Sequence, residues 1–304
     1  MFGFQSSNPR LLDFSRKIIS SKPIKEKTLQ EYKRIHDKIF AKYFSSAKIK
    51  SVSRTDIKNF HKSVGKLNGE YMANRALELL HSIFNEAMED EDIRLPRNPC
   101  RKIERFEEPP CNRYLCDEEL HRLLLAIWQL PTYFKNYFIL LLYIGARGGN
   151  VKSMQWNEVD LDAQKWIIPA KKAKGKKKIV LQLSDVSIIC LQEMQKISGN
   201  SQFVFPAKSK SGHLEEPKKR WYEACKNAGI EDCTMHTLRA TFATHLDELG
   251  IPTKIVSHML GHTDTKTTEV YLRSKRKEKE EAKKAKEAVS LVAKHFDSLI
   301  EKVA

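Results

Sequence analysis

The sequence predicts a mainly α-helical protein of two domains, the second of which carries one small antiparallel sheet. Three observations predict this fold class. Apolar residues recur at helical spacing along most of the 304 residues. The helical pattern is broken near residue 105 by a charged stretch with Pro109-Pro110, and proline cannot continue a helix. Only residues 165–183 alternate as a pair of strands would. A chain of this length can bury two cores of ordinary size.

The first domain is assigned to residues 25–104, after an N-terminal extension of residues 1–24 that precedes the first expected helix. The stretch "TLQEYKRIHDKIFAKYF" has apolar residues at helical spacing with Lys and Arg between them. A second helix is expected after Ser53, because a Ser-x-x-Asp pattern to Asp56 is a capping signal. The long apolar stripe of "EYMANRALELLHSIFNEAMED" predicts another. These segments indicate a small bundle of roughly four helices with basic outer faces.

Residues 105–114 are expected to form a linker, and the second domain then runs over 115–274. It opens with "DEELHRLLLAI", a helix whose first turn is acidic, as the helix dipole favours. The next segment, "FKNYFILLLYIGA", reads as a buried helix. In "KWIIPAKKAKGKKKIVLQL" the apolar residues change from helical spacing to the alternation of β-strands, on both sides of a lysine-glycine turn, which predicts a hairpin. From "EPKKRWYEACKNAGI" onward the pattern is helical again.

Composition limits the kinds of partner and site. The formal charge is +16 and the pI is about 9.5, which favours an anionic partner, most often nucleic acid; the alternative is a soluble protein that is merely basic. The longest apolar run, "YFILLLYIGA", is too short to span a bilayer. With no signal peptide in view and six cysteines without a CxxC pair, we expect a cytoplasmic protein that contacts no membrane. The histidines and cysteines lack ligand spacing, so no metal site is expected.

Two short stretches bring basic side chains together. In "HTLRATFATHLDELG", Leu238, Phe242, Leu246 and Leu249 would form the buried stripe of a helix. His236 and Arg239 share a face at its start, where free backbone N–H groups attract anions. The plainer interpretation is a capping histidine with a solvated arginine. Arg147, between glycines in "IGARGGNVKSMQW", is weak evidence when considered alone.

The combination is more informative than its parts. Arginine forks match the non-bridging oxygens of a phosphodiester and stabilise the charge of its transition state. A tyrosine hydroxyl, with a pKa near 10, becomes a nucleophile once neighbouring cations and bases lower the cost of its ionisation. A lysine on a short hairpin can protonate the leaving oxygen. The sequence offers one such tyrosine in "LGHTDTKTTEVYLR".

Four motifs together resemble the tyrosine recombinases of the phage integrase family. They are "GARGGNVKSMQW", "HTLR", "LGH" and "TTEVYLR", in the family's order and at its separations. The resemblance covers residues 25–275 in arrangement and the second domain in identifiable motifs. It implies a fold of the DNA breaking-rejoining type, with a helical core-binding domain at 25–104 and a catalytic domain at 115–274.

The family's site residues are assigned to this sequence only at positions that match its motifs. Arg147 and Arg239 resemble the two phosphate-binding arginines, and His262 resembles the histidine that hydrogen-bonds the phosphate. The histidine that assists proton transfer corresponds to His236. The implied nucleophile is Tyr271. The remaining position, a lysine in the hairpin turn, falls on Lys174, although Lys172 and Lys176 are close enough to be confused with it. One position departs from the family, because Asn150 stands where an acidic side chain is usual.

The implied activity is strand cleavage through a 3′-phosphotyrosyl intermediate, without metal or cofactor. The implied partners are double-stranded DNA, a homotetramer on two DNA sites, and accessory DNA-bending proteins. An integrase of a phage or mobile element is the first interpretation. A resolvase of chromosome dimers and a DNA-binding module with a silent active site remain as alternatives. The tail, 275–304, has an apolar stripe at Val292, Phe296, Leu299 and Val303, which would dock on a neighbouring protomer or fold back on its own domain.

Overall fold

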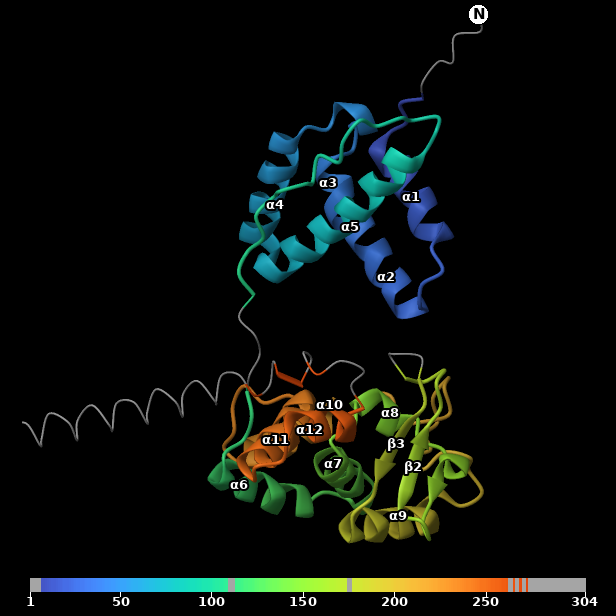
Figure 1. Ribbon diagram of the computed structural model, residues 1–304, viewed down its shortest axis with the longest axis vertical. Coiled ribbons are helices and arrows are strands. Elements are labelled where there is room, and N and C mark those ends of the chain that lie inside the picture. Colours follow the sequence, from blue (N-terminus) through green and yellow to red (C-terminus); the bar gives the residue numbers. More distant parts are fainter. Residues whose placement is uncertain are drawn as a thin grey trace, which may run out of the picture. The chain divides into compact units, whose positions relative to one another are not determined.

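The computed structural model describes residues 7–108, 113–173 and 177–261, together with 265, 268, 269 and 272. The chain divides into two compact units, residues 1–109 and 110–304 (Figure 1). Each unit has its own hydrophobic core. Among the described residues, no helix combines the length and apolarity needed to cross a membrane.

The first unit is built entirely from helices and turns. Its elements are α1 (Leu11–Ser21), α2 (Glu26–Ile35), a π-helical turn (His36–Phe40), α3 (Ala41–Tyr43), a 3-10 turn (Ile49–Ser51), α4 (Arg54–Asn68) and α5 (Glu70–Glu89). The predicted cap of α4 is confirmed, since the Ser53 hydroxyl accepts from the Asp56 N–H and the Asp56 carboxylate accepts from the Ser53 N–H. Helices α4 and α5 pack against each other through their apolar stripes.

Helix α1 corrects one expectation. It lies within residues 1–24, which the sequence placed before the first helix. Leu11, Phe14 and Ile19 of α1 are buried in the core of the unit. The buried His36 ties this helix to the next one, because its Nε2 lies 3.1 Å from the Leu12 carbonyl oxygen. The N-terminal segment is therefore part of the bundle.

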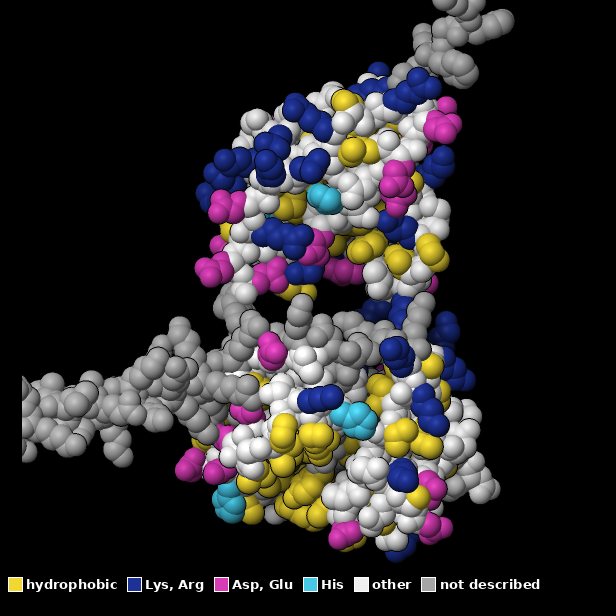
Figure 2. All heavy atoms as spheres, in the orientation of Figure 1, with side chains coloured by type: hydrophobic (Ala, Val, Ile, Leu, Met, Phe, Trp, Pro, Cys, Tyr) yellow, Lys and Arg dark blue, Asp and Glu magenta, His cyan; other side chains and the backbone are white. Residues whose placement is uncertain are grey.

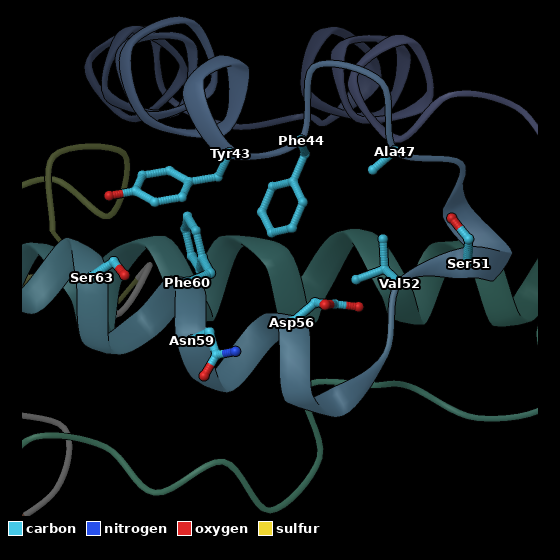
Figure 3. A pocket seen from close by; sticks show the side chains of 9 residues that line it. All are labelled: Tyr43, Phe44, Ala47, Ser51, Val52, Asp56, Asn59, Phe60 and Ser63. Carbon is cyan, nitrogen blue, oxygen red and sulfur yellow. The ribbon is translucent and has the colours of Figure 1, made fainter.

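A pocket of about 330 Å³ opens between the 43–52 segment and α4 (Figure 3). Its walls are largely aromatic and aliphatic, with Phe44, Phe60 and Val52 facing the space. The one charged side chain in the lining, Asp56, is already used to cap α4. Nothing in this lining resembles a phosphate-binding site.

The second unit packs helices around a three-stranded antiparallel sheet, as the sequence predicted. Its helices are α6 (Asp117–Trp128), α7 (Thr132–Ile144), α8 (Gly148–Lys152), a 3-10 turn (Trp156–Glu158), α9 (Asp185–Ser198), α10 (Lys218–Asn227), α11 (Met235–Glu248) and α12 (Thr253–Met259). The strands are β1 (Val159–Asp160), β2 (Lys165–Ile168) and β3 (Ile179–Gln182), in the order β1-β2-β3. The predicted hairpin corresponds to β2 and β3, and β1 adds a short edge.

The hairpin register follows from which side chains are apolar. Trp166 pairs with Leu181 and Ile168 with Ile179 across the two strands. Trp166, Ile168 and Leu181 are buried, so one face of the hairpin joins the core under α7 and α9. A slip of one residue would expose Trp166, which fixes the register.

Helix α11 departs from its expected orientation. Leu238 is fully buried, but Leu249, assigned to the same stripe, is 77% exposed. The buried positions include Arg239, which is only 2% exposed. The helix therefore turns its arginine inward, contrary to the plainer interpretation of a solvated side chain.

Candidate active site

The buried guanidinium of Arg239 joins two helix ends that are distant in sequence. Its Nη1 donates to the Gly145 carbonyl oxygen at 2.6 Å and its Nη2 donates to the Leu260 carbonyl oxygen at 2.8 Å. Gly145 ends α7, and Leu260 ends α12. Hydrogen bonds from a charged group are among the stronger ones in proteins. Arg239 is thus held in a fixed orientation where the predicted motif segments meet.

Gly145 makes this arrangement possible through its backbone. Its φ of +63° is left-handed, a conformation that favours glycine. A Cβ at this position would lie 2.3 Å from Cδ1 of Phe242, which is far inside contact distance. The tight turn ends α7 and directs the chain into Arg147, the residue that precedes α8.

Two parts of the sequence meet at one cleft: His236 and Arg239 from α11, and the segment around Arg147 that leads into α8. The cleft has a volume of about 210 Å³. Ala146 and Gly148, the neighbours of Arg147, line it together with His236 and Arg239. Its remaining lining residues are Tyr137, Gly149, Lys152 and Met235.

His236 is exposed at this cleft, yet enough protein surrounds its ring to affect its ionisation. Burial of the ring lowers the pKa of His236, and the positive charges of Arg239 and Arg147 lower it further. The imidazole therefore favours its neutral form, which can accept a proton. The two cations that add to the effect of burial are the arginines expected to bind phosphate.

The cleft lies at the start of α11, where Thr234 provides the cap. The Thr234 and Thr237 side chains form a reciprocal capping pair at this end. His236 is the second helical residue, so it lies beside backbone N–H groups directed out of the helix. A helix start with two nearby guanidinium groups is a favourable place for a phosphate.

Three predicted site residues, Lys174, His262 and Tyr271, lie outside the described residues. Their described neighbours nevertheless carry information. Leu272, directly after the candidate nucleophile, is 1% exposed and packs against Val256, Leu260 and Ala243. The chain beside position 271 is therefore anchored to α11 and α12, the helices that also hold Arg239.

Lys172, one of the alternatives for the hairpin lysine, makes two contacts inside the second unit. Lys172 has its Nζ 2.5 Å from the Glu158 Oε1 atom and donates to the Ser153 carbonyl oxygen at 2.7 Å. Both of these side chains are largely buried. Lys172 is therefore committed to a structural contact. Asn150, the departure from the family pattern, lies half-buried in α8, and its N–H donates to the Arg147 carbonyl oxygen.

Sequence reasoning missed one residue of the cleft and one buried residue outside it. Lys152 lines the cleft, and its Nζ donates to the Glu215 carbonyl oxygen at 2.5 Å. The one sequence feature that could have indicated Lys152 is its position five residues after Arg147. It was missed because α8 is too short to show a helical period. Glu158 was missed because the sequence around it, "QWNEVD", does not indicate that this carboxylate is buried and Asp160 is exposed.

A second basic surface lies on the first unit. Lys and Arg side chains gather over the edge where α4 lies (Figure 2). A groove of about 540 Å³ there contains Arg54, Lys58, Lys62, Lys102 and Arg105. Glu104 and Glu107 also line it, so the groove is mixed in charge with an excess of cations. Spaced cations of this kind suit the backbone of a nucleic acid better than a small ligand.

Comparison with known proteins agrees with this geometry. The model of the phage integrase family matches residues 113–278. A tyrosine recombinase of Thermosipho africanus is 28% identical over 271 residues, which cover 85% of this chain and 93% of that protein. A prophage integrase of Escherichia coli is 29% identical over 141 residues, which cover 46% of this chain and 31% of that protein. The fold is similar to that of a lambda integrase tetramer bound to a Holliday junction, with a TM-score of 0.73, 21% identity, and coverage of 88% of this chain and 78% of that one.

Proposed function

Because this chain belongs to the phage integrase family of tyrosine recombinases, enzymes that break and rejoin DNA, we propose that it is a site-specific recombinase that integrates the DNA of a phage or mobile element. The observation that carries this proposal is the cleft lined by His236 and Arg239 beside the Arg147 segment, close enough for the charge of Arg147 to act on the His236 ring. Two cations and a neutral base at a helix start suit an attack on a phosphodiester.

The two arginines bind the non-bridging oxygens of the scissile phosphate. The phenolic oxygen of Tyr271 attacks phosphorus as its proton passes to His236, and His262 donates a hydrogen bond to the phosphate. The bond from phosphorus to the 5′-oxygen breaks, and Lys174 gives that oxygen a proton. The products are a 3′-phosphotyrosyl link and a free 5′-hydroxyl. One phosphoester bond replaces another, so the step needs neither a metal nor an energy-rich cofactor.

The assignment of Lys174 is supported by elimination within the hairpin. Lys172 is held by Glu158 and Ser153, so it is a poor candidate for the donor that must reach the leaving oxygen. Lys176 remains the competitor of Lys174, and both positions lie outside the described residues. Substituting each with alanine separates the two.

The proposed DNA substrate is a duplex that both units bind. The basic groove along α4 is proposed to bind its backbone, while the cleft of the second unit acts on one phosphate. Strand exchange between two duplexes needs four active sites, so we propose a homotetramer whose tails, 275–304, dock on neighbouring protomers. Accessory DNA-bending proteins would assist long sites. Such a reaction takes place in the bacterial cytoplasm or nucleoid.

The test is covalent capture of DNA. Incubation of the protein with genomic fragments, followed by detergent and sequencing of the protein-linked fragments, identifies the cleaved site. Tyr271→Phe should abolish capture and leave DNA binding nearly intact, because only the hydroxyl is lost. Tyr222→Phe is the matched control: Tyr222 is 64% exposed on α10 and should be dispensable. Normal capture by Tyr271→Phe would refute the assignment.

The captured sequence also separates the two biological roles. A site that borders the gene of this protein supports an integrase. A single chromosomal site far from the gene supports the resolvase alternative. Covalent capture at either site excludes a silent active site.

A further inference from the structure

A buried ion pair lies under the hairpin of the second unit, away from the cleft. It joins Lys172, in the turn that follows β2, to Glu158, at the end of the 3-10 turn that precedes β1. The Nζ to Oε1 distance is 2.5 Å, and the two side chains are 19% and 5% exposed. Burial of an ion pair rarely gains stability over an apolar contact of the same size. A pair at this depth therefore suggests a role in geometry.

Each partner of the pair is fixed by further contacts. The other carboxylate oxygen of Glu158 accepts from the Gln155 N–H at 3.2 Å and lies 3.5 Å from the Trp166 indole nitrogen. Lys172 donates in addition to the Ser153 carbonyl oxygen at 2.7 Å. The pair therefore connects the 153–158 segment, strand β2 and the turn after β2.

The turn itself is tightly wound where Lys172 lies. The N–H groups of Lys172 and Ala173 donate to the Pro169 carbonyl oxygen at 3.0 and 3.2 Å. Ala173 is buried, with 4% of its surface exposed. The backbone is thus held up to the residue that precedes Lys174.

The 153–158 segment leads back to the cleft. Ser153 directly follows α8, and Arg147 directly precedes it. One end of the ion pair is therefore tied to the helix that begins at the phosphate-binding arginine. The other end lies two residues before the proposed proton donor.

From these contacts we propose that the Lys172–Glu158 ion pair is a positioning device that sets the hairpin lysine relative to Arg147. This inference rests on the proposed function, in which Lys174 protonates the leaving 5′-oxygen. Neither member of the pair touches the DNA. The pair acts by holding the start of the hairpin turn against the segment after α8, so that the ammonium group meets the leaving oxygen.

The chemistry of the leaving group provides the test. In a duplex whose scissile bond runs from phosphorus to a 5′-sulfur, the leaving group is a thiolate. A thiolate is far less basic than an alkoxide and departs without a proton. A variant that fails only in proton donation should therefore recover on the sulfur substrate, whereas a variant with a damaged fold should not.

The experiment uses the full-length protein and nicked duplexes of the captured site, one with oxygen and one with sulfur at the scissile position. Lys172→Met should slow formation of the covalent complex on the oxygen duplex by about 10–100-fold, part of the usual contribution of a general acid. On the sulfur duplex the loss should be less than about 3-fold. Lys171→Met is the matched control, an exposed lysine of the same turn, and should match the wild type on both.

A lone buried Glu158 could prevent folding, so a second variant removes both charges. Glu158→Gln with Lys172→Met leaves no unpaired ion, and the amide oxygen can still accept from Gln155 and Trp166. It should show the same recovery on sulfur. Equal losses on the two duplexes in this variant, or no loss on oxygen, would overturn the positioning role.

Failure of the underlying function gives a different pattern. Lys174→Ala in the otherwise unchanged protein should be slow on oxygen and recover on sulfur. If Lys174→Ala is as fast as wild type on oxygen, the proton donor has been assigned wrongly. If Tyr271→Phe still forms the covalent complex, the nucleophile has been assigned wrongly. Neither of these results depends on the ion pair.

Discussion

Replacing Gly145 with alanine tests whether the turn after α7 positions Arg239. The added Cβ would lie 2.3 Å from Cδ1 and 2.8 Å from Cε1 of Phe242, where ordinary contacts begin near 3.4 Å. The backbone φ of +63° adds its own strain. Gly145 also provides the carbonyl oxygen that receives Nη1 of Arg239. The added methyl group is therefore expected to lower the free energy of unfolding and to displace the Arg239 guanidinium.

The expected loss has two parts that can be separated. A left-handed alanine costs about 1 kcal/mol relative to glycine. Forcing a methyl group into a packed contact costs about 1–3 kcal/mol more. Gly145→Ala should thus lower the free energy of unfolding by about 2–4 kcal/mol. With Phe242→Ala already present the clash disappears, and the same change should cost only about 1 kcal/mol.

Urea unfolding followed by tryptophan fluorescence measures this loss in the full-length chain. The protein has four tryptophans, and all of them, at 128, 156, 166 and 221, belong to the second unit. With a slope of about 2 kcal/mol per molar urea, the midpoint should fall by about 1–2 M. Gly149→Ala is the control, because a Cβ there meets nothing within 4 Å.

The double-mutant cycle decides between two explanations. A coupling of at least about 1 kcal/mol between positions 145 and 242 supports the close contact as the cause. An equal cost of Gly145→Ala in both backgrounds would refute it. Cleavage by Gly145→Ala should fall more than DNA binding, because the strained turn shifts the carbonyl oxygen that holds Arg239 while the basic groove on α4 is unchanged.

Three further predictions concern the site and the tail. Arg147→Ala and Arg239→Ala should each reduce cleavage by about 2–4 kcal/mol of transition-state stabilisation, with a much smaller loss of DNA affinity in gel-shift assays; equal losses would make them ordinary phosphate contacts. In an NMR titration the His236 ring should titrate below its usual pKa of 6.5, and Arg147→Gln should raise the midpoint. Since the folded state then binds fewer protons than the unfolded one, His236 should reduce stability as the pH falls below 6.5; a midpoint above 6.5 would contradict this. Deleting residues 288–304 should preserve binding to a single site and abolish strand exchange, whereas a large fall in melting temperature would place the tail on its own domain.

The family and the elements of the fold could be predicted from the sequence because both depend on local order. The spacing of apolar residues is enough to predict α4, α5, α6 and α7, and the capping signal at Ser53 needs only the residues next to it. The β2–β3 hairpin follows from alternation on both sides of a lysine-glycine turn. Motifs such as "HTLR" are likewise read within one segment.

Burial inside the second unit could not be predicted in this way. On α11 the spacing of apolar residues favoured a stripe that included Leu249, yet Leu249 is exposed and Arg239 is buried. The reason is physical: a helical period gives the relative angles of side chains, whereas the neighbouring elements decide which angle faces the core. Arginine can lie inside only because two helix ends, at Gly145 and Leu260, provide carbonyl oxygens for it.

The choice among lysines shows the same limit. By sequence, Lys172 and Lys174 are two members of one basic run, and no local pattern tells them apart. The tertiary structure pairs Lys172 with Glu158, a residue 14 positions away in sequence, which is a contact that no local pattern predicts. Sequence order thus determined which residues are predicted for the site. For the described ones, the three-dimensional packing decided their place at the cleft, because only folding brings distant charges within reach of one another.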